Sequence, residues 1–198
     1  MVIRTSTSDP LRIDSVQPQK STGRVGMTLC PGKTDPRAET GSWDRDLDMD
    51  LEVAVKWGAS VIVSLMEEHE FGLLQVPSLG EAVVRHGMKW LHLPIPDQQS
   101  PGADFETNWF CESGREIKQF LDDEHNIVLH CRGGLGRTGT VAAKLLFEYG
   151  EHPKRAIDLV REARRDEHAR KHTIENEVQE EYVRSLTRRL SDPMLDGP

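Results

Sequence analysis

The sequence lacks the features of several large protein classes. Its 198 residues contain only three cysteines, too few for a disulfide framework, and none stands in a paired CxxC metal spacing. No apolar run approaches the roughly 20 residues of a membrane-spanning helix, and the opening MVIRTSTSDP lacks the apolar core of a signal peptide. We therefore expect a soluble protein of the cytoplasm, a reducing compartment.

Positive charge is also scarce, since 25 Lys and Arg stand against 33 Asp and Glu for a formal net charge of −8. Nucleic acids and anionic membranes require a positive protein surface, so we expect neither as a partner. An anionic substrate would have to be bound locally. The chain length and the 36% of hydrophobic residues are typical of one globular domain with a substantial core.

Strand-like and helix-like segments alternate through most of the chain. Short apolar runs typical of buried strands precede the turn at 30–33 and recur at 60–66, 88–96 and 126–130. Helical patterns lie between them at 48–58, 76–87 and 104–121, and three more follow, at 140–150, from 153 onward and at 175–190. This order predicts an α/β fold with a mostly parallel central sheet of four or five strands, flanked by helices, and a helical C-terminal part.

The ends of the chain differ from its middle. Residues 1–22 are polar and without a sustained period, which predicts an N-terminal arm that is poorly ordered or lies against the domain. Residues 23–190 form the predicted domain, and residues 191–198 form a C-terminal tail. In a sheet of this kind ligands bind at the carboxyl ends of the strands, so we expect the functional residues in the loops there.

The segment 128–140, VLHCRGGLGRTGT, runs from a predicted strand through a glycine-rich loop into a helix. Backbone N–H groups that turn inward in such a loop, together with the positive end of the helix, form an anion site suited to phosphate. Cys131 stands at the start of the loop, where these groups and Arg137 favour the nucleophilic thiolate. Arg137 could bind two phosphoryl oxygens at once. Three glycines give the loop its freedom to curl: Gly133, Gly134 and Gly136.

The competing interpretation is a flexible turn with Cys131 as a small buried hydrophobe and Arg137 as a solvated surface residue. A cysteine and an arginine at this separation, after a strand and before a helix, make a coincidence improbable.

The segment 130–138, HCRGGLGRT, fits the signature HCxxGxxR(S/T) of the protein tyrosine phosphatase superfamily. Its GGLGR core most resembles the dual-specificity branch that contains the kinase-associated phosphatases, the cyclin-dependent kinase inhibitor 3 family. The resemblance extends over roughly residues 26–186 and includes VPSL, HLPIPDQQSP and IENEVQEEYV. It implies hydrolysis of phosphomonoesters through a phosphocysteine intermediate, without a metal or another cofactor.

The resemblance also implies roles for further residues. Asp97 stands where relatives carry the acid that protonates the leaving oxygen, and it follows Pro96 at the predicted end of a strand. Thr138 would donate its hydroxyl to the sulfur when the intermediate breaks, or cap the helix. Gln179 matches a glutamine that positions water in many relatives, although Asn176-Glu-Val replaces the Thr-Pro-Glu often found beside it.

Several assignments have open alternatives. His130 is expected to be a buried residue that fixes the loop. Arg132 would attract an anionic substrate or merely reach solvent. Residues 67–70 would rim the pocket or form a solvated loop, and Asp104 is the reserve candidate for the acid. The predicted phosphate-binding residues are Arg132, Gly133, Gly134, Leu135 and Gly136.

The predicted function is a protein phosphatase acting on phosphotyrosine and on phosphoserine or phosphothreonine, with a phosphoprotein and possibly a kinase as partners. A phosphoinositide or RNA 5′ phosphate is a rival substrate, but the loop lacks extra lysines and the chain is acidic. A binding module without catalysis is a rival of another class, which the presence of Cys131, Arg137 and Asp97 disfavours. Cys30 and Cys111 are expected to be structural, with a redox role left open, and the sequence gives no oligomeric state.

Overall fold

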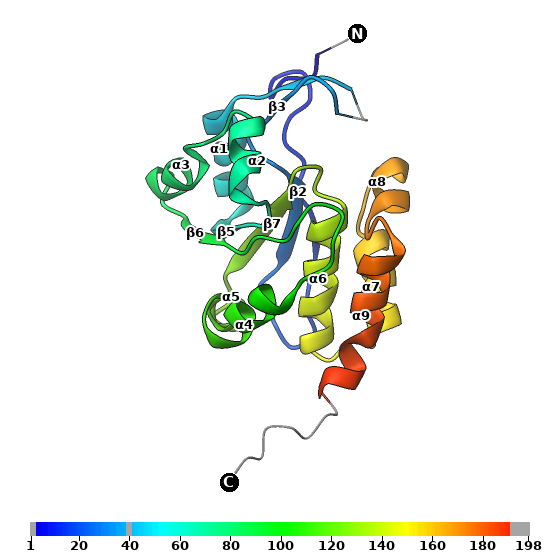
Figure 1. Ribbon diagram of the computed structural model, residues 1–198. Coiled ribbons are helices and arrows are strands. Elements are labelled where there is room, and N and C mark those ends of the chain that lie inside the picture. The colour runs from blue at the N-terminus through cyan, green and yellow to red at the C-terminus, as the bar shows by residue number, and fades with distance from the viewer. Residues whose placement is uncertain (1–2, 39–40, 191–198) are drawn as a thin grey trace.

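The centre of the molecule is a five-stranded sheet with the strand order β1-β2-β7-β5-β6 (Figure 1). It is seen in a computed structural model that describes residues 3–38 and 41–190. The strands of the sheet are β1 (Asp14–Val16), β2 (Val25–Leu29), β5 (Ala59–Ser64), β6 (Lys89–His92) and β7 (Asn126–Cys131). A separate two-stranded ladder pairs β3 (Thr34–Asp35) with β4 (Trp43–Asp44).

Helices cover both faces of the sheet, and α1 to α3 form a group apart from α4 to α7 in Figure 1. The chain moves one way along the sheet through β5 and β6 and then returns to β7, and by the general handedness of such crossovers α1 to α3 and the pair of α4 and α5 fall on opposite faces. Among the described residues no helix combines the length and the apolar character needed to cross a membrane. The helices are α1 (Leu47–Trp57), α2 (Glu68–Leu73), α3 (Leu79–Arg85), α4 (Ala103–Cys111), α5 (Ser113–Asp122), α6 (Gly136–Glu148), α7 (Pro153–Glu162), α8 (Glu167–His172) and α9 (Glu177–Leu190).

Strand β7 lies in the middle of the sheet and runs parallel to both of its neighbours. Its residues Ile127, Val128 and Leu129 are at most 1% exposed, which explains the continuous apolar run in the sequence. In its register Cys131 lies opposite Leu29 of β2, and His130 lies opposite Ser64 of β5. The carboxyl ends of these strands therefore meet at one edge of the sheet, where β7 ends at the cysteine.

Local signals set the boundaries of α1. The side chain of Asp46 accepts a hydrogen bond from the Met49 N–H at the start of the helix. Gly58 ends it in the left-handed conformation, with φ 90°, and its N–H is bonded to carbonyls of the last turn. The glycine at the end of the predicted helix thus marks the observed end, and β5 begins at the next residue.

The predicted fold class is confirmed, since four of the five strands, β2, β7, β5 and β6, run parallel to one another and the C-terminal part is helical. Within the predicted arm, β1 pairs antiparallel with β2, and Leu11, Ile13 and Val16 are buried in the core. Residues 11–16 thus lie against the domain. The division of the chain at residue 22 stays a prediction, and the predicted tail at 191–198 lies outside the described residues.

The predicted helix at 104–121 is wrong as a single element. The chain breaks at Glu112, with φ −134° and ψ −92°, into α4 and α5. Both parts bury apolar residues, so the apolar spacing alone did not reveal the break. Gly114 permits it, because a Cβ on this residue would lie 2.2 Å from the carbonyl oxygen of Trp109. The six-residue helix α2 was not predicted, and the helix predicted from 153 onward is divided into α7 and α8.

Candidate active site

The loop between β7 and α6 surrounds the sulfur of Cys131. The N–H of Gly134 donates a hydrogen bond to Cys131 Sγ at 3.2 Å, and the cysteine is 3% exposed. Gly134 has φ 74°, and a Cβ there would lie 2.4 Å from the backbone carbonyl of Thr28. Only glycine fits this position without displacing the loop. Helix α6 begins at Gly136, earlier than the predicted start near residue 140, so its amino-terminal end is part of the loop.

Arg137 is 2% exposed and held by two acidic side chains. Its Nη1 and Nη2 atoms bind the two carboxylate oxygens of Glu70 at 2.6 and 2.9 Å, which is the bidentate geometry that fixes a guanidinium plane. Nη1 also donates to the carbonyl of Ile95 at 3.1 Å, and Nη2 lies 2.9 Å from Asp97 Oδ1. Three groups from two segments, α2 and the loop after β6, therefore orient this arginine in the wall of the site.

Glu70 is the functional residue that sequence reasoning did not single out, since it was grouped with residues 67–70 as possible rim. It is 5% exposed, and its Oε2 also accepts from the Glu67 N–H at 2.8 Å at the start of α2. Burial raises its pKa, but the hydrogen bonds and charge of Arg137 outweigh this effect and hold the pKa below its usual value. Glu70 is thus a carboxylate that keeps Arg137 in place.

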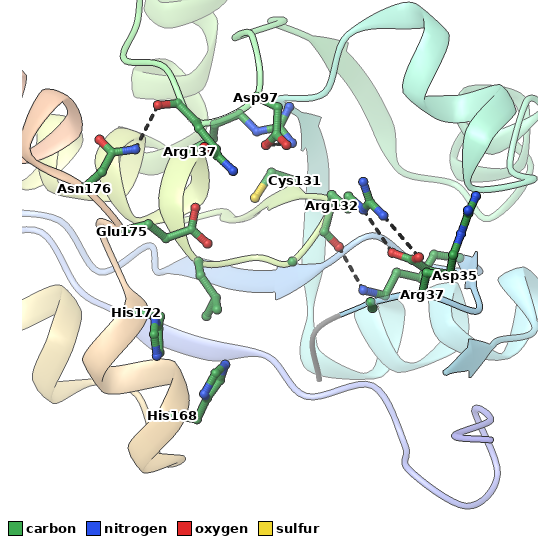
Figure 2. A pocket seen from close by; sticks show the side chains of 15 residues that line it. Asp35, Arg37, Asp97, Cys131, Arg132, Arg137, His168, His172, Glu175 and Asn176 are labelled. Carbon is green, nitrogen blue, oxygen red and sulfur yellow. Dashed lines mark hydrogen bonds and ion pairs between the residues drawn. The ribbon is translucent and has the colours of Figure 1, made fainter. Parts of the chain in front are cut away.

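Asp97 lies where the sequence predicted, in the loop after β6. Its side chain is 53% exposed and points to the guanidinium of Arg137 (Figure 2), which Glu70 also binds. Asp104, the reserve candidate, is exposed in the first turn of α4 and is not among the described residues that line the cavity around Cys131. The geometry brings Asp97, and not Asp104, to Arg137.

His130 is fully buried behind the loop. Its Nε2 lies 2.6 Å from the hydroxyl of Ser64, which in turn accepts a hydrogen bond from Trp90 Nε1 at 2.8 Å. Because burial disfavours the imidazolium ion, the pKa of His130 is lowered to about 3. A neutral ring fixed in this way matches the predicted structural position of the residue.

The hydroxyl of Thr138, the third residue of α6, is buried and has no hydrogen-bond partner among the described residues. A buried hydroxyl without a partner is energetically unfavourable, and such groups occur most often where a site is completed by a ligand or a reacting atom.

Gln179 is likewise 0% exposed, and both ends of its amide are bonded. Its Oε1 accepts from the Glu175 N–H at 2.9 Å, and its Nε2 donates to the carbonyl of Gln99 at 3.3 Å. The predicted role of Gln179 in positioning water stays a prediction.

A cavity of about 510 Å³ opens over Cys131 (Figure 2). Arg132, Gly133 and Leu135, three of the predicted phosphate-binding residues, line it. Gly134 lines a neighbouring cavity of about 500 Å³, together with residues of the N-terminal segment. The guanidinium of Arg132 binds both carboxylate oxygens of Asp35 at 2.9 and 3.1 Å, and its side chain is 43% exposed, so its role toward an anionic substrate stays a prediction. Helix α8, whose place beside the site was not predicted, contributes His168 and His172 to the wall of the first cavity.

A second arginine supports the loop from behind. Arg164, just after α7, is 3% exposed, and its Nη2 donates to the carbonyl of Gly134 at 2.5 Å. Its Nε donates to Thr173 Oγ1 at 3.0 Å. No motif in the sequence distinguishes this arginine from the neighbouring charged residues, so it could not have been identified before the fold was known.

All three cysteines are free. Cys30 is buried, Cys111 is exposed and Cys131 lies in the loop. Burial raises the pKa of the Cys30 thiol, which keeps it in the unreactive protonated form. In the described part of the chain no group of three or more His, Cys, Asp or Glu side chains is arranged to hold a metal ion.

Comparison with known proteins gives both sequence relatives and similar structures. Cyclin-dependent kinase inhibitor 3 of Rattus norvegicus is 31% identical over 122 residues, which are 61% of this chain and 56% of that protein. A probable protein tyrosine phosphatase type IVA A of Dictyostelium discoideum is 34% identical over 79 residues, 40% of this chain and 46% of that protein. The chain thus spans about half the length of the curated relatives it matches.

Among solved structures, a kinase-associated phosphatase with serine in place of its catalytic-site cysteine matches with a TM-score of 0.77 at 24% identity. The match covers 91% of this chain and 96% of that one, and it shows the fold. Tk-PTP in its active form matches with a TM-score of 0.61 at 26% identity, over 84% of this chain and 93% of that one. The resemblance stated from the signature is confirmed. Residues 46–151, more than half of the chain, match the family described as "Polymorphic toxin system, DSP-PTPase phosphatase", and the chain belongs to this family.

Proposed function

We propose that this protein is a cysteine-dependent phosphatase that hydrolyses phosphomonoesters on the tyrosine and the serine or threonine side chains of proteins. The observation that carries the proposal is the constellation of Cys131, Arg137 and Asp97 around one cavity. A nucleophile, an oriented guanidinium and a carboxyl group at the cavity mouth are the three parts that this reaction needs. The sequence relatives include proteins named as tyrosine phosphatases, in agreement with this assignment.

In the first step the thiolate of Cys131 attacks phosphorus, an S–P bond forms and the P–O bond to the substrate breaks. Arg137 and the loop N–H groups bind the equatorial oxygens and stabilise the charge of the transition state. Glu70 contributes by holding the guanidinium plane, at 2.6 and 2.9 Å, so that no reorientation is needed when the phosphoryl group arrives. Asp97, in its protonated form, gives its proton to the leaving oxygen.

In the second step water attacks the phosphocysteine and the S–P bond breaks. Asp97, now a carboxylate, accepts a proton from the water, and inorganic phosphate leaves. The hydroxyl of Thr138, unpaired among the described residues, would donate to the sulfur as negative charge returns to it. Neither step requires a metal ion or an organic cofactor.

The proposed partner is a phosphorylated protein, with a kinase as one candidate because the relatives include proteins named kinase inhibitor or kinase-associated phosphatase. We propose a cytoplasmic location, because a catalytic thiol requires a reducing compartment and all three cysteines are free.

Hydrolysis of p-nitrophenyl phosphate in EDTA, under reducing conditions and across a pH series, tests the proposal. We expect turnover by the wild type, its loss in Cys131→Ser, and slower turnover in Asp97→Ala. Cys111→Ser, which removes an exposed thiol outside the cavity, is the matched control and should retain wild-type turnover. Activity that survives in Cys131→Ser would overturn the assignment of the nucleophile, and a wild type without turnover would overturn the enzymatic function.

A further inference from the structure

Two side chains at the start of α9 are bonded to the loop that carries Asp97. Asn176 Nδ2 donates to the carbonyl of Gln98 at 2.8 Å, as Figure 2 shows. Gln179 Nε2 donates to the carbonyl of Gln99 at 3.3 Å. Both acceptors belong to the residues that directly follow Asp97, so these bonds restrict where its carboxyl group lies.

The two donors are themselves fixed. Asn176 Oδ1 accepts from the N–H of Gln179 at 3.0 Å and so caps the first turn of α9. Gln179 Oε1 accepts from the N–H of Glu175 at 2.9 Å, and the Gln179 side chain is 0% exposed. A donor that is held at its other end loses little further freedom when it binds the loop.

The backbone on both sides of this contact is in an unfavourable conformation. Gln98 has φ 58° and Ile174 has φ 59°, in the left-handed region that residues other than glycine rarely adopt. This conformation is unfavourable for both residues and persists only where surrounding contacts enforce it. The bond between Asn176 and Gln98 lies within this contact and contributes to that enforcement.

The other side of the same loop is attached to the site. Arg137 donates to the carbonyl of Ile95 at 3.1 Å and lies 2.9 Å from Asp97 Oδ1. The loop that carries Asp97 is therefore held at two places. Arg137 contacts Ile95 and Asp97 itself, and Asn176 contacts Gln98, the residue after Asp97.

We propose that Asn176, assisted by Gln179, is a positioning residue that holds the Asp97 loop where Asp97 can protonate the leaving oxygen. This inference rests on the proposed phosphatase function. Asn176 acts through the loop, and its contribution falls on the step in which the S–P bond forms, the P–O bond breaks and the proton of Asp97 moves to the leaving oxygen.

Asn176→Asp is the variant that isolates this contact. A carboxylate keeps the oxygen that caps α9 but replaces the donor to Gln98 with an oxygen that faces a carbonyl. Asn126→Asp is the matched control, because Asn126 also donates to a backbone carbonyl, that of Gly58 at 3.4 Å, and accepts from a backbone N–H, that of Arg24 at 2.9 Å. It lies at the opposite end of β7 from the cysteine.

The measurement is kcat/KM for phenyl phosphate and for p-nitrophenyl phosphate. Phenol is the poorer leaving group and depends more on protonation, so Asn176→Asp should lower kcat/KM for phenyl phosphate by about 10- to 100-fold and for p-nitrophenyl phosphate by about threefold or less. In an Asp97→Asn background Asn176→Asp should cause no further loss, because its effect passes through Asp97. Asn126→Asp should leave both substrates at wild-type rates.

Equal losses on the two substrates, or a loss that adds fully to that of Asp97→Asn, would overturn the positioning role, as would a wild-type rate in Asn176→Asp. Those outcomes leave the phosphatase function standing. A wild type that hydrolyses neither substrate would instead overturn the proposed function, and the positioning role with it.

Discussion

The buried histidine behind the loop predicts a specific dependence of stability on pH. His130 is fully buried, and its pKa falls from 6.5 to about 3 on folding. Between these values the unfolded chain binds a proton that the folded chain does not, so the free energy of unfolding rises with pH in this window. Stability from this residue is therefore present above about pH 6.5 and is lost as the pH falls below it.

The magnitude follows from the two pKa values. Each pH unit inside the window corresponds to about 1.4 kcal/mol, so the loss between pH 7 and pH 5 is about 2 kcal/mol. Measurements that stop at pH 5 report the titration of His130 and not that of Glu70. The ordinary pKa of Glu70 is 4.5, and folding lowers it further. The stability that Glu70 contributes is lost only at lower pH, as the solution passes through its depressed pKa.

The assay is equilibrium urea unfolding at pH 7, 6 and 5 for the wild type and for His130→Asn. The variant will be less stable at every pH, because it removes the contact between His130 and Ser64, but it lacks the titrating group. Its free energy of unfolding should therefore decrease between pH 7 and pH 5 by about 2 kcal/mol less than that of the wild type. His69→Asn, which removes an exposed histidine of α2, is the matched control. Parallel pH curves for the wild type and His130→Asn would refute the reasoning.

Three further predictions concern the loop and the core. Glu70→Gln removes the charge that fixes Arg137, and steady-state kinetics should show kcat/KM lower by about 100-fold, because a guanidinium misplaced by about 1 Å binds the transition state poorly. Gly134→Ala should lower the free energy of unfolding by more than about 2 kcal/mol in urea, whereas Gly133→Ala, with no atom within 4 Å of its Cβ, should change it by about 0.5 kcal/mol. Lys144→Met removes a buried ammonium group that pairs with two half-buried carboxylates, those of Glu106 and Glu148, and should destabilise the protein by about 2 kcal/mol.

Each of these predictions has an outcome that would contradict it. Wild-type kcat/KM in Glu70→Gln would mean that the remaining contacts suffice to orient Arg137. Equal stability of the two alanine variants would mean that the loop adjusts to a side chain at Gly134. For the lysine, Lys56→Met is the control, since that side chain is 75% exposed and its ion pair is worth little. Equal effects of the two lysine substitutions would contradict the argument from burial.

The sequence predicted the parts of the fold and site that local patterns encode. The strand before Cys131 appears as an apolar run, and the loop after it is marked by glycines at fixed offsets. The end of α1 is marked by Gly58. Each of these features involves residues close together in the chain, and each was found at or near its predicted place.

The parts that could not be predicted depend on contacts between distant segments. Glu70 and Arg137 are 67 positions apart, and nothing in the charged run 67–70 shows which carboxylate turns inward. The break at Glu112 was hidden because apolar residues continue at helical spacing on both sides of it. Helix α8 is short and has no buried residue, so no apolar periodicity marks it.

The bond from Arg164 to the carbonyl of Gly134 means that the segment which identifies the family is shorter than the segment which holds the loop in place. The family match ends at residue 151, after the whole HCxxGxxR segment but before this arginine. A fragment cut at that boundary would carry the nucleophile and the phosphate-binding residues and would lack the group that holds the loop from behind. When this protein is dissected or engineered, the C-terminal helices should therefore be kept together with the loop around Cys131.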